Sequence, residues 1–116
     1  RQFLFRREHV GKSKALVAAE QVKKFNPSAK LQIIAHHGNI KDKKFGADFM
    51  QKFDLVFNAL DNIEARRHVN RVCIAVDKPL IDGGTQGYDG QVVTIKRGTA
   101  ACYDCEPKPA PKGFAV

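Results

Sequence analysis

The sequence predicts an α/β fold in which helices cover a mostly parallel sheet. Residues 13–25 and 62–76 carry the apolar spacing of amphipathic helices, with Ala65, Val69 and Val72 as an example. Short apolar runs typical of buried strands alternate with these helices, at residues 31–35, 54–60 and 80–81. Strands and helices that alternate along a chain are typical of parallel strands joined by helical crossovers.

The ends of these elements carry recognisable signals. Ser13 can cap the first helix, and Asn26 and Pro27 end it. Pro79 follows the second helix. We expect residues 83–90, which include four glycines, to form a long loop before a last strand at 91–95.

The composition favours a soluble domain with an acidic partner. The 116 residues are 43% hydrophobic and carry a formal charge of +8, from 20 basic and 12 acidic residues. The basic residues are scattered, so nucleotide phosphate is a better candidate partner than nucleic acid. No apolar run reaches the length of a membrane span. The three cysteines, without a secretion signal, favour a reducing compartment.

Asp61 is the residue most suggestive of chemistry. It follows the apolar run Leu55-Val56-Phe57, where a buried strand ends and a helix begins. In open α/β sheets, ligands bind outside the carboxyl ends of the strands, and a carboxylate there suits a hydrated Mg²⁺ that carries phosphates. The alternative is that Asp61 only caps the helix. Lys14, in the first turn of its helix, is either a phosphate contact or an exposed lysine.

Cys102 and Cys105 form a Cys-x-x-Cys motif that can supply two thiolates to one Zn²⁺. Structural zinc takes four ligands, so we interpret the motif as half of a zinc site. A redox pair and two unrelated cysteines are the alternatives, and the absence of a following helix disfavours the redox pair. Cys73 lies beside an apolar helix face and is expected to be a buried core residue. His36 and His37 are expected at the surface.

Several motifs occur together in one order along nearly the whole chain: the opening Arg1-Gln2-Phe3-Leu4-Phe5, then Gly11-Lys12-Ser13-Lys14, Ala59-Leu60-Asp61-Asn62 with Asn70, Gly84-Thr85-Gln86-Gly87, and Cys102-Tyr103-Asp104-Cys105. The ordered set resembles the adenylation domain of the E1 enzymes that activate ubiquitin-like proteins. The resemblance is greatest to the SUMO-activating type. The bacterial MoeB and ThiF adenylyltransferases have a similar, Rossmann-like fold.

The resemblance implies a set of site residues. In this family ATP is joined to the C-terminal carboxylate of the modifier, which then passes to a cysteine as a thioester. By resemblance, Asp61 ligates Mg²⁺, and Arg1 and Lys14 contact the phosphates of ATP. The adenine lies near Asn39 and Ile40. Cys102 and Cys105 are two of four zinc ligands. The nucleotide floor is implied to include Asp61, Asn62, Ile63, Glu64, Ala65 and Arg66.

We expect the segment to be truncated at both ends, with a partial adenylation domain at residues 1–106 and the start of a proline-containing linker at 107–116. The family's thioester cysteine would follow that linker, so no catalytic residue is expected in this segment. The implied partners are a smaller E1 subunit, SUMO and an E2 conjugating enzyme, without membrane or nucleic acid. The implied location is the nucleus, with the cytoplasm as an additional location.

Two other functions fit parts of the pattern. The first is a MoeB- or ThiF-like adenylyltransferase that acts on a sulfur-carrier protein. The opening motif resembles that family as much as it resembles the SUMO-activating type. The second is a non-catalytic basic module that binds nucleic acid through a zinc knuckle. That module would bind in a salt-sensitive manner, and it leaves Asp61 unexplained.

Overall fold

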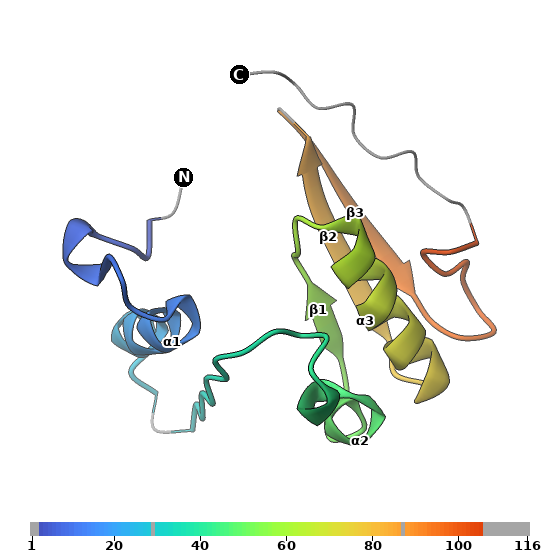
Figure 1. Cartoon of the computed structure of the whole chain (residues 1–116), viewed down its shortest axis with the longest axis horizontal. Helices are drawn as coiled ribbons and strands as arrows, with labels where there is room; N and C mark the ends of the chain where they lie inside the picture. Colours follow the sequence, from blue (N-terminus) through green and yellow to red (C-terminus); the bar gives the residue numbers. More distant parts are fainter. Residues whose placement is uncertain (1–2, 29, 87, 106–116) are drawn as a thin grey trace. The chain divides into compact units, whose positions relative to one another are not determined.

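The computed structural model describes residues 3–28, 30–86 and 88–105, and the chain divides into two compact units, Arg1–Asn39 and Ile40–Val116 (Figure 1). The first unit contains a short 3-10 helix, η1 (Arg7–His9), and the helix α1 (Lys14–Phe25). The helix predicted at residues 13–25 is therefore confirmed. Ser13 occupies its N-cap position, although the serine side chain makes no capping hydrogen bond.

The strand predicted at residues 31–35 is wrong, because this stretch has no regular structure. A strand becomes stable only when its backbone groups pair with a neighbouring strand. The described residues of the first unit contain no strand that could serve as this neighbour. An apolar, β-branched sequence alone is therefore insufficient here.

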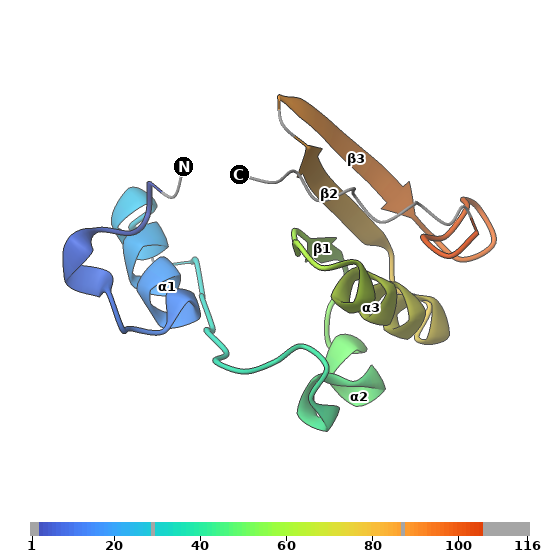
Figure 2. The same ribbon diagram turned by 45° about the horizontal axis from the view of Figure 1, so that its top comes forward.

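The second unit is an α/β structure, as predicted. In chain order it contains η2 (Lys43–Phe45), α2 (Ala47–Met50), β1 (Val56–Asn58), α3 (Ile63–Ala75), β2 (Leu80–Gln86) and β3 (Asp89–Ile95). The strands lie in the order β1-β2-β3, with β1 parallel and β3 antiparallel to β2, so the described sheet is mixed. Figure 2 shows α3 along one face of the sheet. No helix in the described part of the chain is long and apolar enough to cross a membrane.

The glycine-rich loop expected at residues 83–90 is wrong. The two strands continue into this stretch, and the register pairs Gly83 with Val92 and Thr85 with Gly90. At Gly84 the missing side chain provides space, because a Cβ atom there would lie 2.8 Å from Nη1 of Arg66. This glycine therefore accommodates a neighbouring side chain and does not mark a turn.

The core of the second unit lies between α3 and the sheet. Val69 and Cys73 of α3 pack with Leu80 of β2 and Ile95 of β3, and each of the four is at most 3% exposed. Cys73 is thus a buried core residue, as predicted, and its burial raises the pKa of the thiol. On the opposite face of the sheet, which α3 does not cover, Val92 of β3 is 74% exposed.

This arrangement predicts different costs for two truncations on β3. The Ile95→Ala substitution should lower the free energy of unfolding by about 2–5 kcal/mol, because it opens a cavity in the core. The Val92→Ala substitution should change the free energy by less than about 0.5 kcal/mol, because the side chain faces solvent. Urea unfolding of the 116-residue chain measures both changes. Equal costs at the two positions would contradict the assignment of faces.

Candidate functional site

The turn between β1 and α3 holds Asp61 at the carboxyl end of a strand. Asn58, the last residue of β1, accepts a hydrogen bond from the Leu60 backbone N–H at 3.1 Å and so shapes the turn. Asn62 caps α3, because its Oδ1 atom accepts from the Ala65 N–H at 3.1 Å. The capping role considered for Asp61 therefore belongs to Asn62. The Asp61 side chain is exposed and makes no hydrogen bond or ion pair with the described residues.

Arg66 fixes this turn to the end of β2. Its Nε atom donates to the carbonyl oxygen of Leu60 at 2.5 Å, and its Nη2 atom donates to that of Gly83 at 2.9 Å. Its Nη1 atom pairs with Asp82 Oδ2 at 3.1 Å, and the two side chains are only 16% and 4% exposed. The planar guanidinium suits this three-way contact because its donors are held in fixed directions.

Two buried polar atoms mark the same edge of the sheet. Asn58 Nδ2 and Asp82 Oδ1 are both buried without a hydrogen-bond partner among the described residues. Asn58 and Asp82 are neighbours in the register of β1 and β2. Buried polar groups are nearly always paired, so this donor and this acceptor are available to a water or a ligand. Their place at the carboxyl ends of parallel strands agrees with the general location of ligand sites in α/β sheets.

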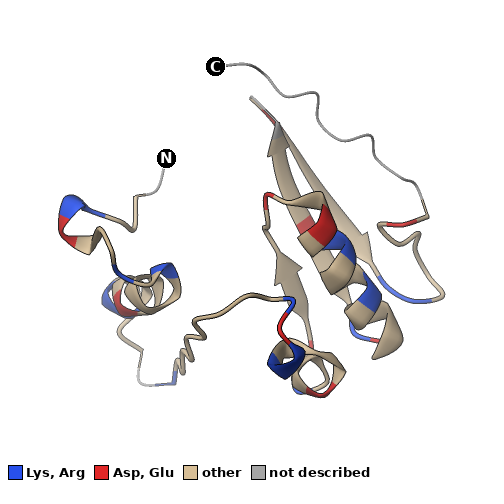
Figure 3. Cartoon of the chain, viewed as in Figure 1, with Lys and Arg blue, Asp and Glu red and all other residues tan. Residues whose placement is uncertain are grey.

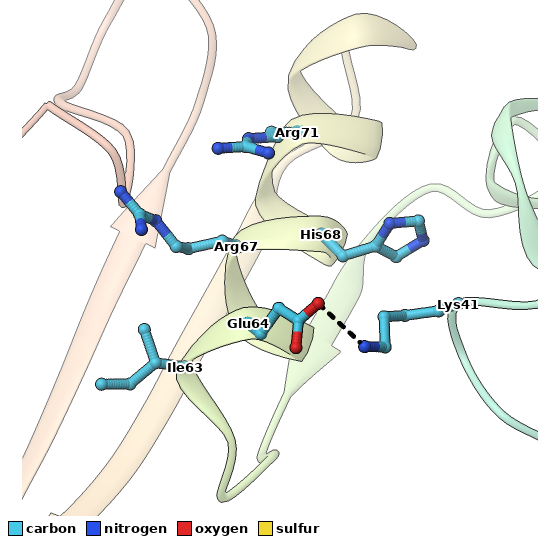
Figure 4. Close-up of a pocket in the computed structure, with 6 residues that line it drawn as sticks. All are labelled: Lys41, Ile63, Glu64, Arg67, His68 and Arg71. Atoms are coloured by element: carbon cyan, nitrogen blue, oxygen red, sulfur yellow. Dashed lines mark ion pairs between the residues drawn. The ribbon is translucent and has the colours of Figure 1, made fainter. Parts of the chain in front are cut away.

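A pocket of about 430 Å³ lies along the exposed side of α3 (Figure 4). Lys41 points toward Glu64 across it and pairs with the glutamate at 3.1 Å. His68 Nε2 is buried there without a partner among the described residues. Of the predicted site residues only Ile63 and Glu64 line the pocket, so the sequence missed the other four. The lining is mainly basic and suits an anion: Lys41, Ile63, Glu64, Arg67, His68 and Arg71.

In the first unit, Lys14 lines a basic hollow of about 210 Å³ together with Arg6 and Lys12. The turn before α1 contains Gly11, whose φ of 83° favours glycine. Three cations around one hollow give it a positive potential, and the phosphate contact of Lys14 stays a prediction. The other member of that prediction, Arg1, lies outside the described residues.

Asn39 and Ile40 stand at the boundary between the two units. Asn39 is exposed and ends the first unit, whereas Ile40 begins the second and packs against its core. Among the remaining predicted floor residues, Ala65 donates its N–H to the cap residue Asn62 and is partly buried. The predicted adenine contacts of Asn39 and Ile40 stay predictions.

The Cys-x-x-Cys motif forms a tight turn. The Cys102 and Cys105 sulfurs are 3.2 Å apart, and the Cys105 N–H donates to the Cys102 carbonyl at 3.0 Å. Two thiolates on one tetrahedral zinc, with bonds near 2.3 Å, are separated by about 3.8 Å, so a small opening of the turn would fit the ion. Hydrogen bonding from Cys105 is the main cause that lowers the pKa of the Cys102 thiol. Within the described residues no group of three or more candidate ligands is close enough to hold a metal.

Helix α3 holds this turn through three residues that the sequence did not reveal as a group. The Asp104 carboxylate pairs with Arg67 Nε at 2.6 Å and with Arg71 Nε at 3.1 Å, and Arg67 lowers the pKa of that carboxyl. The Tyr103 N–H donates to Asn70 Oδ1 at 3.1 Å. Figure 3 shows the arginines of α3 in blue along its ribbon. Residues 67, 70 and 71 share one side of the helix because of its i, i+3, i+4 spacing.

The ThiF family matches residues 1–115, which is nearly the whole chain. The chain belongs to the ThiF family. The adenylation-type fold expected from the ordered motifs is thereby confirmed.

Three relatives of this ThiF-family chain are named as SUMO-activating or ubiquitin-activating enzymes. It is 55% identical over all 116 residues to SUMO-activating enzyme subunit 2 of Dictyostelium discoideum. It is 50% identical over 109 residues to SUMO-activating enzyme subunit uba-2 of Caenorhabditis elegans, and 39% identical over 117 residues to ubiquitin-activating enzyme E1-like of Saccharomyces cerevisiae. The chain spans 17% of the first relative and 18% of each of the other two.

The assignment of the cap in this ThiF-family chain can be tested with two alanine substitutions. Asn62→Ala should lower the free energy of unfolding by about 1 kcal/mol, because it leaves a helix N–H without its acceptor. Asp61→Ala should change it by less than about 0.5 kcal/mol, because its carboxylate contacts no described residue. Urea unfolding of both variants measures these two changes in the free energy of unfolding. A larger loss at Asp61 than at Asn62 would return the cap to Asp61.

Proposed function

We propose that this chain is part of the adenylation domain of an E1 enzyme that activates SUMO. The single observation that carries the proposal is the free Asp61 carboxylate at the carboxyl end of β1, beside a helix that Asn62 already caps. Sequence identity of 55% and 50% to SUMO-activating enzyme subunits supports SUMO as the modifier over a sulfur-carrier protein.

In the proposed reaction, a carboxylate oxygen of the modifier's C-terminus attacks the α-phosphorus of ATP, and pyrophosphate leaves. Charge moves onto the phosphate oxygens in this step, and fixed positive groups stabilise it. Mg²⁺ ligated by Asp61 would supply a Lewis acid at these oxygens. Lys14 would contact the phosphates, and Arg6 and Lys12 add positive charge around its hollow. Arg1 would be a further phosphate contact.

The turn after Asp61 would form the floor of the nucleotide site, with the adenine near Asn39 and Ile40. Arg66 would stabilise this floor mainly by its contacts within the protein, because its guanidinium already donates hydrogen bonds to Leu60, Asp82 and Gly83. Two of its five N–H donors remain for a ligand. The basic pocket on α3 continues from Ile63 and Glu64 and would add favourable potential for the anionic nucleotide.

The parent protein would bind structural zinc, with Cys102 and Cys105 as two of its ligands. The distance of 3.2 Å between the two sulfurs supports this assignment. The proposed partners are a smaller E1 subunit, SUMO and an E2 conjugating enzyme, and the proposed location is nuclear.

The test is SUMO-dependent ATP–pyrophosphate exchange by the full-length protein with its partner subunit. Asp61→Asn should lower the exchange rate by roughly 100-fold, since the metal and its charge stabilisation would be lost. Asp54→Asn is the matched control, because Asp54 is exposed and precedes β1, at the other end of the strand. It should keep the wild-type rate.

Two results would contradict the proposal. One is a full-length protein that shows no SUMO-dependent exchange, and the other is an Asp61→Asn variant as active as the Asp54→Asn control. We further expect the 116-residue chain alone to show no exchange. Measurable exchange by that chain would mean that its 116 residues hold a complete nucleotide site.

A further inference from the structure

Asn70 is a buried polar residue of α3 that lies beside the core. Its side chain is 1% exposed, and it lies on α3 next to Val69 of the core. Burying an amide costs free energy unless the amide is hydrogen-bonded. Asn70 Oδ1 accepts a hydrogen bond from the Tyr103 N–H at 3.1 Å. The partner of this buried amide is therefore the backbone between the two cysteines.

A pair of ion pairs on the solvent side also holds this turn against α3. The Asp104 carboxylate, also between the cysteines, lies between Arg67 and Arg71 at 2.6 and 3.1 Å. The Asp104 side chain is 25% exposed, whereas those of Arg67 and Arg71 are 43% and 68% exposed, so solvent screens both pairs in part. One carboxylate shared by two arginines restricts the turn more than a single pair would. Both residues between Cys102 and Cys105 are thus attached to one side of α3.

The geometry points to Arg67, Asn70 and Arg71 as positioning residues that hold Cys102 and Cys105 ready for zinc. This inference rests on the proposed zinc half-site. Partners of this kind orient metal ligands, and their loss typically lowers metal affinity about 10–100-fold. Here the three contacts fix the turn while its sulfurs are already 3.2 Å apart, so little reorganisation is needed when the ion binds.

The test uses the full-length protein and zinc itself. Zinc retention is measured by competition with a chromophoric chelator for the wild type and for Asp104→Ala, which removes both ion pairs. We expect the zinc affinity to fall about 10-fold or more in this variant. Asp104→Glu keeps the carboxylate and should restore most of the affinity. Asp89→Ala is the matched control, because Asp89 is exposed and makes no ion pair in the described part of the chain.

A metal-independent readout accompanies the affinity. In zinc-free protein, the Tyr103 amide should exchange its hydrogen faster in Asp104→Ala than in the wild type, because the turn is released from α3. A variant with altered zinc affinity but unchanged exchange at Tyr103 would overturn the positioning role. If Asp104→Ala does not fold, Arg71→Gln serves instead, since the Arg71 side chain is 68% exposed and lies outside the core.

The remaining outcomes separate this inference from the proposed function. A wild-type protein that retains no zinc overturns the half-site and the positioning role together. A wild type that retains zinc, with Asp104→Ala retaining it equally well, overturns only the positioning role. Loss of affinity in Asp104→Ala, with retention in Asp104→Glu and Asp89→Ala, supports it.

Discussion

The contact of Arg66 with Leu60, Asp82 and Gly83 is the interaction on which the rest of the site depends. One side chain of α3 joins the turn that carries Asp61 to the end of β2. The carboxylate of Asp82 is 4% exposed, and a charge buried to this degree needs a partner at close range. Gly84 provides the space for the guanidinium, because any Cβ there would meet it. The strand, the turn and the helix therefore keep one arrangement at the edge where a ligand would bind.

Helix α3 performs separate tasks on its different sides. Its first turn is capped by Asn62, and this leaves the carboxylate of Asp61 available. Val69 and Cys73 face the sheet and form the core with Leu80 and Ile95. The side that carries Arg67, Asn70 and Arg71 holds the cysteine turn. A helix of 13 residues thus connects the proposed nucleotide edge with the proposed zinc half-site, although the two involve different side chains.

The parts of the fold that depend on local patterns could be predicted from the sequence. Both helices have clear apolar spacing, and the placement of Cys73 beside an apolar face was enough to predict its burial. The strand expected at residues 31–35 failed because pairing depends on a neighbour that a local pattern does not specify. The glycines at 83, 84 and 90 were taken for a loop, whereas they belong to strands, and Gly84 is explained only by the distant Arg66.

The candidate site, too, could be predicted from the sequence only where the signal is local. Asp61 and the Cys102–Cys105 pair could be found because their neighbours in the sequence carry the signal. The contact between Arg66 and Asp82 joins residues 16 positions apart, and those between α3 and Asp104 span 33 and 37 positions. No periodicity connects residues at such separations. Asn70 belongs to one of the sequence motifs, but its role follows only from the hydrogen bond that it accepts from the Tyr103 backbone N–H.

The most direct test of this account is a double-mutant cycle on Arg66 and Asp82, measured by urea unfolding of Arg66→Leu, Asp82→Asn and the double variant. The account predicts that Arg66→Leu lowers the free energy of unfolding by about 3–5 kcal/mol, because it leaves the Asp82 charge buried and unpaired. The double variant should recover part of this loss, with a coupling energy of roughly 1–3 kcal/mol. Additive effects, or a stable Arg66→Leu variant, would contradict the claim that this contact organises the site.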